Sequence, residues 1–329
     1  MSIMLQKLDY KILFELDSNA RQSYNEIAKR VGTSKQVVAY HTNNLLKEGY
    51  IKKFLTIIDL SKVGLILHKV YLRLARTSAE DEVVILNFLK NNSNVAWLVR
   101  TEGIYDLAFA VHTKDIIELN NMLLDFENRF GNFISEKIVN RVITGEFFHR
   151  DYLVAGKQSG FRKNIIFESQ EKPSLLDQID WKILSALSRD ARMSVVDISE
   201  IVPIGADAVG KRIKNLEKKG IIKNYIIVLD DSKLNQVHYK ILLKISHFTE
   251  ESERKFLDFC RKHKNVTFYN KNIGAWEVEF DLEVKNSEDF RDIMRILKKE
   301  FAEFIKEYFS LILYDILKFD FLPMHEFKN

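Results

Sequence analysis

The sequence predicts an α+β fold in which a helical module and a βαββαβ module occur twice in tandem. First, the chain aligns with itself without a gap at one offset of 171 residues, which relates Asp9 to Asp180 and Gly103 to Gly274. Second, each copy begins with apolar residues at helical spacing and continues with the alternation typical of strands. Because one offset holds throughout, corresponding loops have equal lengths and both copies are expected to share one fold.

Each copy opens with three predicted helices. In copy one, apolar positions from Leu8 onward predict the first helix, and Ser23 with Glu26 forms a capping box that starts the second. The second helix ends at Gly32, and Ser34 offers the N-cap of the third. A short helix, a tight turn and another helix give the spacing of a helix-turn-helix motif.

A glycine and a β-rich segment follow each third helix. Gly49 is expected to adopt the left-handed conformation that ends the helix, and residues 50–58 predict a wing-like strand. Copy two repeats the pattern with Gly220 and residues 221–229. A winged helix-turn-helix is therefore expected twice.

The third helices carry outward polar side chains suited to DNA. Amide and phenol groups can read base edges in a major groove while Lys and Arg side chains hold phosphates. The candidate DNA contacts are Ser34, Lys35, Gln36, Tyr40, His41, Asn43, Asn44 and Lys47 in copy one, and Lys211, Arg212, Lys214 and Lys218 in copy two. A solvated helix face would look similar alone, but the complete motif occurs twice. We predict double-stranded DNA as a partner, with base reading mainly by copy one.

The rear part of each copy has the ferredoxin-like order βαββαβ. In copy one the expected elements are a strand at 69–74, a helix at 82–90, strands at 95–100 and 106–112, a helix at 116–130 and a strand at 137–144. In copy two they lie at 240–245, 253–263, 266–271, 277–284, 288–304 and 307–317. Two helices cover only one sheet face, so the other should pair with a second sheet, in a homodimer or within the chain.

These patterns divide the chain of 329 residues into four domains and a linker. The linker is expected to be a tether with at most one strand, near Ile165. The predicted bounds are 1–56 and 175–227 for the winged helix-turn-helix domains, 65–152 and 237–323 for the ferredoxin-like domains, and 153–174 for the linker.

The residues resemble the Lrp/AsnC family of feast-or-famine transcriptional regulators in a tandem form. The family opening, Leu-Asp-x-x-Asp-x-x-Ile-Leu, is echoed at 8–13 and 179–184, and its third-helix pattern at 34–45 and 205–216. Copy one has His41 where the pattern has Arg. The resemblance implies a sequence-specific DNA-binding regulator with RAM-type rear domains that assemble the protein, as a homo-oligomer, and bind a small effector.

The turns between the middle strands resemble the family's Thr-Gly-x-x-Asp effector turn. The resemblance implies that an amino acid or another small metabolite binds there. Glycine permits close backbone approach, and a carboxylate could hold an ammonium group. The alternative is an ordinary turn whose carboxylate caps its own backbone. The candidate effector residues are Gly103, Tyr105 and Asp106 in copy one and Gly274, Trp276 and Glu277 in copy two.

The sequence carries none of the common enzymatic motifs, so we expect no catalytic residues and no cofactor. The single Cys260 excludes an internal disulfide, and the dispersed histidines give no metal signature. One alternative is a tandem enzyme similar to siroheme decarboxylases, which share the two-module fold, although the strands at 94–100 and 265–271 lack a His-x-Tyr-x-Arg grouping. Another is an effector-binding or partner-docking scaffold that does not bind DNA.

Charge and hydropathy favour a cytoplasmic protein. The net charge of +4 is concentrated in the two helical modules, as expected if they face phosphates. No apolar run reaches the roughly 18 residues needed to span a bilayer, and the N-terminal segment lacks the apolar core of a signal peptide. We therefore expect no membrane partner.

Overall fold

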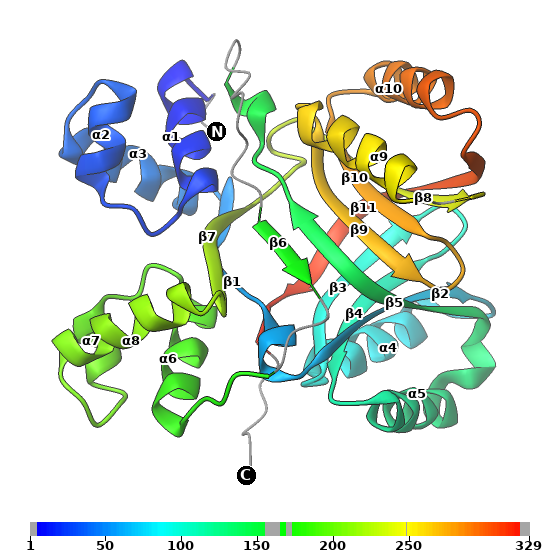
Figure 1. Cartoon of the computed structure of the whole chain (residues 1–329), viewed down its shortest axis with the longest axis horizontal. Helices are drawn as coiled ribbons and strands as arrows, with labels where there is room; N and C mark the ends of the chain where they lie inside the picture. Colours follow the sequence, from blue (N-terminus) through cyan, green and yellow to red (C-terminus); the bar gives the residue numbers. More distant parts are fainter. Residues whose placement is uncertain (1–4, 155–164, 169–172, 248, 323–329) are drawn as a thin grey trace.

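The two copies interlock along their whole length in the computed structural model (Figure 1). The structure describes residues 5–154, 165–168, 173–247 and 249–322, so most of the linker lies outside the described residues. The winged helix-turn-helix modules lie together on one side of the molecule and the ferredoxin-like modules on the other. Within the described ranges, no helix is long and apolar enough to cross a membrane.

The predicted helices of both front modules are confirmed, and so are their caps. The Ser23 hydroxyl accepts a hydrogen bond from the backbone N–H of Glu26, whose carboxylate accepts one from the Ser23 N–H. Gly49 adopts φ 73°, as the left-handed helix end requires. The helices are α1 (Lys7–Ser18), α2 (Tyr24–Val31) and α3 (Lys35–Lys47) in copy one, and α6 (Gln178–Arg189), α7 (Val195–Ser199) and α8 (Ala206–Lys218) in copy two.

The two wing-like strands pair with each other. β1 (Ile51–Ile58) and β7 (Ile222–Leu229) form an antiparallel ribbon between the copies. The guanidinium of Arg21 donates to the carbonyl of Ala191 at 2.6 Å, and Arg192 makes the equivalent contact in the opposite direction. Apolar residues of both modules also merge into one core. The helix-turn-helix modules are therefore a fixed pair within one chain.

The βαββαβ order is also confirmed in both copies. Helix α10 ends four residues earlier than expected, because Phe301 leaves the helical conformation at φ −120°, ψ 22° and its side chain joins the copy-two core. Copy one contains β2 (Ile66–Leu74), α4 (Ala79–Asn91), β3 (Val95–Glu102), β4 (Leu107–Thr113), α5 (Ile116–Phe130) and β5 (Ile134–Phe147). Copy two contains β8 (Val237–Ile245), α9 (Glu250–Lys262), β9 (Val266–Ile273), β10 (Val278–Val284), α10 (Ser287–Glu300) and β11 (Ile305–Phe319).

The two sheets join into one closed antiparallel barrel. Its strands run in the order β2-β4-β3-β11-β8-β10-β9-β5, and β5 also pairs with β2. The linker strand β6 (Ile165–Glu168) attaches to the free side of β5, as its apolar run predicted. Helices α4 and α5 cover the outside of the copy-one strands, and α9 and α10 cover those of copy two.

Barrel closure places the uncovered sheet faces of the two copies against each other inside the chain. Of the two arrangements expected, the described structure has the one within the chain, because β5 reaches β9 and β11 reaches β3. A homodimer through the inner faces would require the barrel to open. Assembly of several chains through other surfaces stays a prediction.

Gly274 of copy two packs closely against Asn140 of copy one at the barrel wall. It adopts φ 153°, and a Cβ at this position would lie 2.0 Å from Oδ1 of Asn140 on β5. We expect Gly274→Ala to reduce the free energy of unfolding by about 2 kcal/mol or more, measured by chemical denaturation. Gly131→Ala is the matched control, because its Cβ would meet no described atom within 4 Å. Equal stabilities of the two variants would contradict this packing.

Candidate functional site

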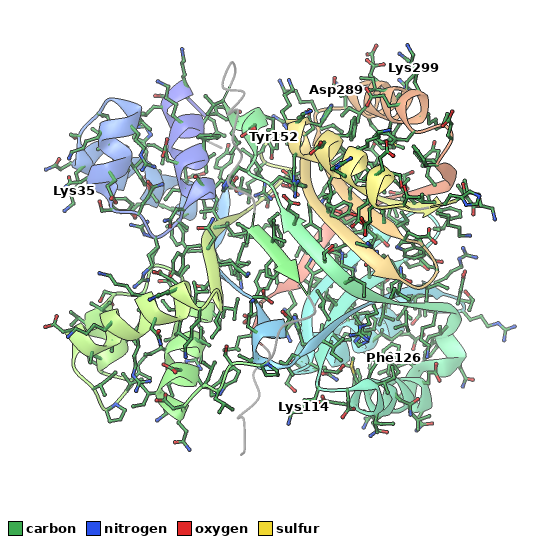
Figure 2. All side chains as sticks on the ribbon, in the orientation of Figure 1. Lys35, Lys114, Phe126, Tyr152, Asp289 and Lys299 are labelled. Atoms are coloured by element: carbon green, nitrogen blue, oxygen red, sulfur yellow. The ribbon has the colours of Figure 1, made fainter. Side chains whose placement is uncertain are left out.

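The third helices present the predicted polar faces to solvent. Tyr40 is 65% exposed, and Lys35 projects from the outer side of the module, away from the barrel (Figure 2). The predicted residues that are exposed are Ser34, Lys35, Gln36, Tyr40, Asn43 and Lys47 on or beside α3 and Lys211, Lys214 and Lys218 on α8. Three others, His41, Asn44 and Arg212, are half-buried.

His41 and Arg212 occupy the same position of the two copies and bind acidic residues of the first helices. The Nδ1 atom of His41 lies 2.7 Å from Asp9, and Nη1 of Arg212 lies 2.8 Å from Asp180. Arg212 also contacts Asp177 at 2.7 Å. Both side chains therefore hold a third helix against a first helix. Their contact with DNA stays a prediction, and it would require them to leave these pairs.

The predicted effector turns use their carboxylates to cap strand ends. Asp106 accepts a hydrogen bond from the backbone N–H of Leu74 at 2.7 Å, and Glu277 accepts one from Ile245 at 2.7 Å. The ordinary-turn alternative expected each carboxylate to cap the backbone of its own turn, but both cap the end of a neighbouring strand, β2 or β8. Gly103, with φ 138°, approaches the backbone of β11, and Gly274 approaches β5. Binding of an effector at these turns is untested.

Tyr105 and Trp276 of the same turns point into the barrel. The Trp276 ring lies 4.9 Å from that of Tyr71, and the Tyr105 ring 5.7 Å from it. The indole N–H of Trp276 donates to Oε1 of Glu279 at 2.8 Å. These side chains fill the barrel interior near the turns and do not line the cavity described next.

A cavity of about 160 Å³ lies between the β1–β7 ribbon and the mouth of the barrel, and we call it the mouth cavity. Ile58 and Val228 line it from the ribbon, and Trp97 and Phe268 from the barrel wall. Phe167 of the linker strand lines it as well. The cavity is thus built jointly by the helix-turn-helix modules, the barrel and the linker strand.

The two copies contribute different chemistry to the barrel interior. Lys69 and Lys240 are equivalent by the 171-residue offset and both point inward. Copy two adds three inward carboxylates on β10 where copy one has small or neutral side chains on β4. The corresponding pairs are Glu279 and Ala108, Asp281 and Ala110, and Glu283 and His112.

Each inward lysine is paired with a carboxylate. The Nζ atom of Lys69 lies 2.7 Å from Oε2 of Glu279, and Lys240 contacts Asp281. Burial lowers the pKa of Lys69 to about 8, although Glu279 acts in the opposite direction. Both ammonium groups also lie within 6 Å of the Trp97 ring, a distance at which cation–π attraction contributes.

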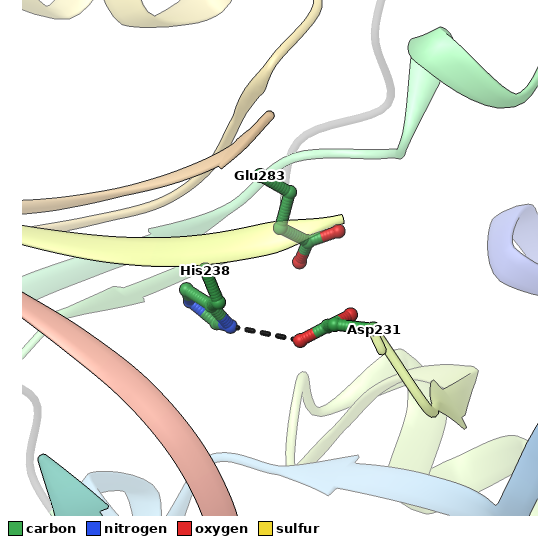
Figure 3. A group of neighbouring side chains, drawn as sticks. All are labelled: Asp231, His238 and Glu283. Carbon is green, nitrogen blue, oxygen red and sulfur yellow. Dashed lines mark hydrogen bonds and ion pairs between the residues drawn. The ribbon is translucent and has the colours of Figure 1, made fainter. Parts of the chain in front are cut away.

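His238 bridges two carboxylates at the mouth of the barrel. Its Nδ1 lies 3.0 Å from Asp231, drawn in Figure 3, and its Nε2 lies 3.1 Å from Asp281. Burial acts to lower the pKa of His238, but the hydrogen bonds to both carboxylates outweigh it and raise that pKa to about 10. His238 is therefore an imidazolium with both ring nitrogens donating.

Asp231, His238 and Glu283 offer ligand atoms within 4.8 Å of one another, a spacing that could hold a metal ion. A metal needs a free lone pair on the imidazole, however, and both nitrogens of His238 face carboxylates. Glu283 in turn accepts hydrogen bonds from Nε and Nη2 of Arg150 at 2.8 and 3.0 Å. The donor set therefore fits an ion-pair network better than a metal site.

Arg150 connects this network to the helix-turn-helix side of the molecule. Its Nη1 lies 2.7 Å from Asp17 at the end of α1, while its other nitrogens hold Glu283 on β10. One guanidinium thus joins the first helix-turn-helix module to the barrel. Arg150, and Tyr152 which also contacts Glu283, lie at the C-terminal end of the predicted first ferredoxin-like domain, just before the predicted linker.

The interior network was not predicted from the sequence. The sequence did contain a signal for it. His238 and Lys240 are two residues apart, as are Glu279, Asp281 and Glu283, so each set lies on one face of a strand. Alternating polar residues usually mark the solvent face of an antiparallel sheet. In this barrel they face inward, because the helices already cover the other face.

Sequence comparisons place the chain among known proteins. A family model of winged helix-turn-helix DNA-binding domains matches residues 5–52 and 176–223. A proline dehydrogenase transcriptional activator of Rhizobium radiobacter is 33% identical over 135 residues, which are 41% of this chain and 85% of that protein. The HTH-type transcriptional regulator LrpA of Pyrococcus abyssi is 32% identical over 123 residues, 36% of this chain and 84% of that protein.

The chain belongs to the Lrp/AsnC family. Each of these relatives matches less than half of it, as expected for a member with two copies of the family unit.

A solved structure matches both copies of this Lrp/AsnC-family chain at once. The siroheme decarboxylase NirDL superposes with a TM-score of 0.62 over 98% of this chain and 95% of its own, at 13% sequence identity. Its complex with an iron-uroporphyrin III analogue also gives a TM-score of 0.62, at 12% identity over 97% of this chain and 94% of its own. These likenesses show that the tandem architecture is shared.

Buried neutral histidines of the barrel predict a loss of stability in mild acid. Burial lowers the pKa of His112 to about 3, below the value near 6.5 of an unfolded chain. The stability contributed by the neutral ring is complete above the unfolded pKa and is lost as the pH falls toward the folded one. For His112 this amounts to about 2 kcal/mol at pH 5.

We therefore expect His112→Gln to lose less stability than the unmodified chain between about pH 7 and pH 5, measured by urea denaturation. His238 remains protonated in both proteins over this range. His247→Gln is the control, because this side chain is exposed. If the free energy of unfolding of His112→Gln and of the unmodified chain changes equally with pH, His112 is not held in the neutral form.

Proposed function

We propose that the chain is a sequence-specific DNA-binding transcriptional regulator that contacts DNA through α3 and α8. The observation that carries the proposal is the fixed pair of helix-turn-helix modules, whose third helices both keep exposed polar faces. One chain thus offers two recognition helices in a set relation, as a dimeric regulator would. The relatives that support the proposal are named as transcriptional regulators.

The two recognition helices are proposed to divide the work. Gln36, Tyr40 and Asn43 on α3 are exposed groups that can hydrogen-bond to base edges. On α8 the exposed positive residues Lys211 and Lys214 suit phosphates, which carry no sequence information. Copy one would then supply most of the specificity and copy two much of the affinity. A small metabolite is proposed to control this activity.

A triple variant tests the contribution of α8. Changing Lys211, Lys214 and Lys218 to Gln should weaken binding to all DNA sequences by at least about tenfold and reduce the slope of log K against log salt by roughly 3. By contrast, Tyr40→Ala with Asn43→Ala should relax sequence preference. Binding is measured by fluorescence anisotropy on fragments selected from the source genome.

The matched control changes three exposed lysines of the copy-two barrel domain, Lys255, Lys285 and Lys299, to Gln. This control keeps the same net charge as the α8 variant and should bind DNA like the unmodified chain. If both triple variants bind equally, α8 makes no phosphate contact. If the unmodified chain binds no DNA at low salt, the proposal is wrong and the scaffold alternative is favoured.

A second candidate is an enzyme that acts on a tetrapyrrole. The fold of the chain is shared with siroheme decarboxylase NirDL over nearly the whole length, and the mouth cavity contains buried histidines and lysines. Its size argues against this candidate, since a cavity of about 150 Å³ holds a single benzene. A tetrapyrrole would enter only if the modules moved apart.

The decarboxylase candidate makes a distinct prediction. Added siroheme would bind to the chain with a shifted Soret absorption band and would lose carboxyl groups, detected by mass spectrometry. The regulator proposal predicts neither change. Decarboxylation by the purified chain, without DNA binding, would replace the first proposal by the second.

A further inference from the structure

The mouth cavity contains polar atoms that the protein leaves unsatisfied. Among the described residues, Nδ1 of His112 and Nε2 of His149 have no hydrogen-bond partner, and each residue is 7% exposed. Oδ1 of Asp231 is also buried without a partner, since His238 contacts only its other oxygen. All three residues line the cavity. Buried polar atoms of this kind are costly unless something else pairs with them.

One carboxylate of the cavity lining favours a positively charged occupant. Four lining residues carry positive charge, namely Lys69, Arg150, His238 and Lys240. Six lining residues carry carboxyl groups, namely Asp17, Asp59, Asp231, Asp281, Glu283 and Asp320. Outside the lining, Lys223 lies 3.3 Å from Asp59, and Glu279 binds Lys69. Lys53, Lys318 and Arg189 act electrostatically on Asp320, so the cavity has no excess of carboxylates. Two lining carboxylates have a buried oxygen without a hydrogen bond, and of these Asp59 is paired with Lys223 whereas Oδ1 of Asp231 has no partner.

The remaining wall is apolar and largely aromatic. Trp97 and Phe268 face the cavity from opposite copies, and Phe147, Phe319 and Phe321 line it near the linker strand. A volume of about 160 Å³ suits one aromatic ring with a short side chain. An apolar cavity with a few fixed polar groups is the usual form of a small-molecule site.

We propose that the mouth cavity binds a small arylalkylamine, whose ring packs between the aromatic side chains and whose alkylammonium group donates to Oδ1 of Asp231. The ammonium group satisfies the unpaired oxygen of Asp231. The site differs from the family turns at Asp106 and Glu277, which do not line the cavity.

The position of the cavity gives the ligand a means to act on DNA binding, a step that rests on the proposed function. Ile58 and Val228 belong to the ribbon that joins the two helix-turn-helix modules, and Trp97 and Asp281 belong to the barrel. A molecule that contacts both parts stabilises one placement of the modules relative to the barrel. It therefore shifts DNA affinity if that placement differs from the one that binds DNA.

The first experiment compares two probes that share a ring and a two-carbon length but differ in charge. Phenethylamine and phenylacetate are titrated into the full chain by isothermal titration calorimetry. Phenethylamine should bind saturably at one site per chain, and phenylacetate at least about tenfold more weakly. Equal affinities would overturn the choice of an amine, and absence of saturable binding by both probes would overturn the site.

Two variants locate the binding. Asp231→Asn should weaken phenethylamine binding by about tenfold or more, while Asp106→Asn, at the family turn, should leave it unchanged. The reverse result would place the ligand at the turn and overturn the proposal. Because Asp231 also contacts His238, Ala110→Leu provides a second test that keeps every charge and fills the cavity. Thermal unfolding checks that each variant is folded, and a folded Ala110→Leu that binds normally would overturn the site.

DNA binding is measured separately, with and without phenethylamine. If the chain binds the amine but no DNA, the cavity proposal stands and the proposed function falls. If the chain binds DNA with an affinity that the amine does not change, the function stands and the link between cavity and DNA binding is wrong. A change in DNA affinity that is lost in Asp231→Asn supports both.

Discussion

Closure of the barrel depends on two strands that are long enough to pair twice. β5 pairs with β2 through residues 134–141 and with β9 through residues 141–147, and β11 does the same with β8 and β3. Each ferredoxin-like unit alone would expose two sheet edges, which invite aggregation. Because each long strand satisfies one edge in its own copy and one in the other, neither copy completes its sheet alone. The helix-turn-helix modules depend on each other in the same way, because their apolar residues form one shared core.

Closure of the barrel also buries the side chains on the inner sheet faces, including charged ones. A buried ion pair such as Lys69 with Glu279 gains little net stability, because removing both charges from water costs several kcal/mol. Once the pair is buried, losing one partner costs about 3 to 5 kcal/mol. A hydrophobic interior of Leu and Val would be simpler to stabilise. The inner strands nevertheless keep six charged groups, namely Lys69, His238, Lys240, Glu279, Asp281 and Glu283. Such an interior is more easily understood as the lining of a chamber than as a packed core.

The helices, strands and caps could be predicted because local periodicity determines them. Ser23 and Glu26 form their box within a single turn, and Gly49 needs only its own φ. The partner of a strand is a property of distant residues, so β1 was expected as a wing and is found bound to β7. Likewise, alternation at Glu279 and Asp281 shows that they share a face, but only barrel closure decides that this face is inside. Arg150 lay at the end of the first predicted ferredoxin-like domain with no role assigned to it, because a bridge between Asp17 and Glu283 leaves no pattern in the sequence.

Covalent linkage of the copies has a consequence for symmetry. In a homodimer every substitution occurs twice, so a carboxylate at the position of Asp281 would face an identical carboxylate across the axis. Here the equivalent position is Ala110, so β10 contributes inward carboxylates and the equivalent positions of β4 contribute none. The chamber is therefore asymmetric in charge. A polar molecule inside it has one preferred orientation, and the chain has no symmetry-related second site. Binding in this chamber therefore cannot be cooperative between two equivalent sites, as it could be in a homodimer.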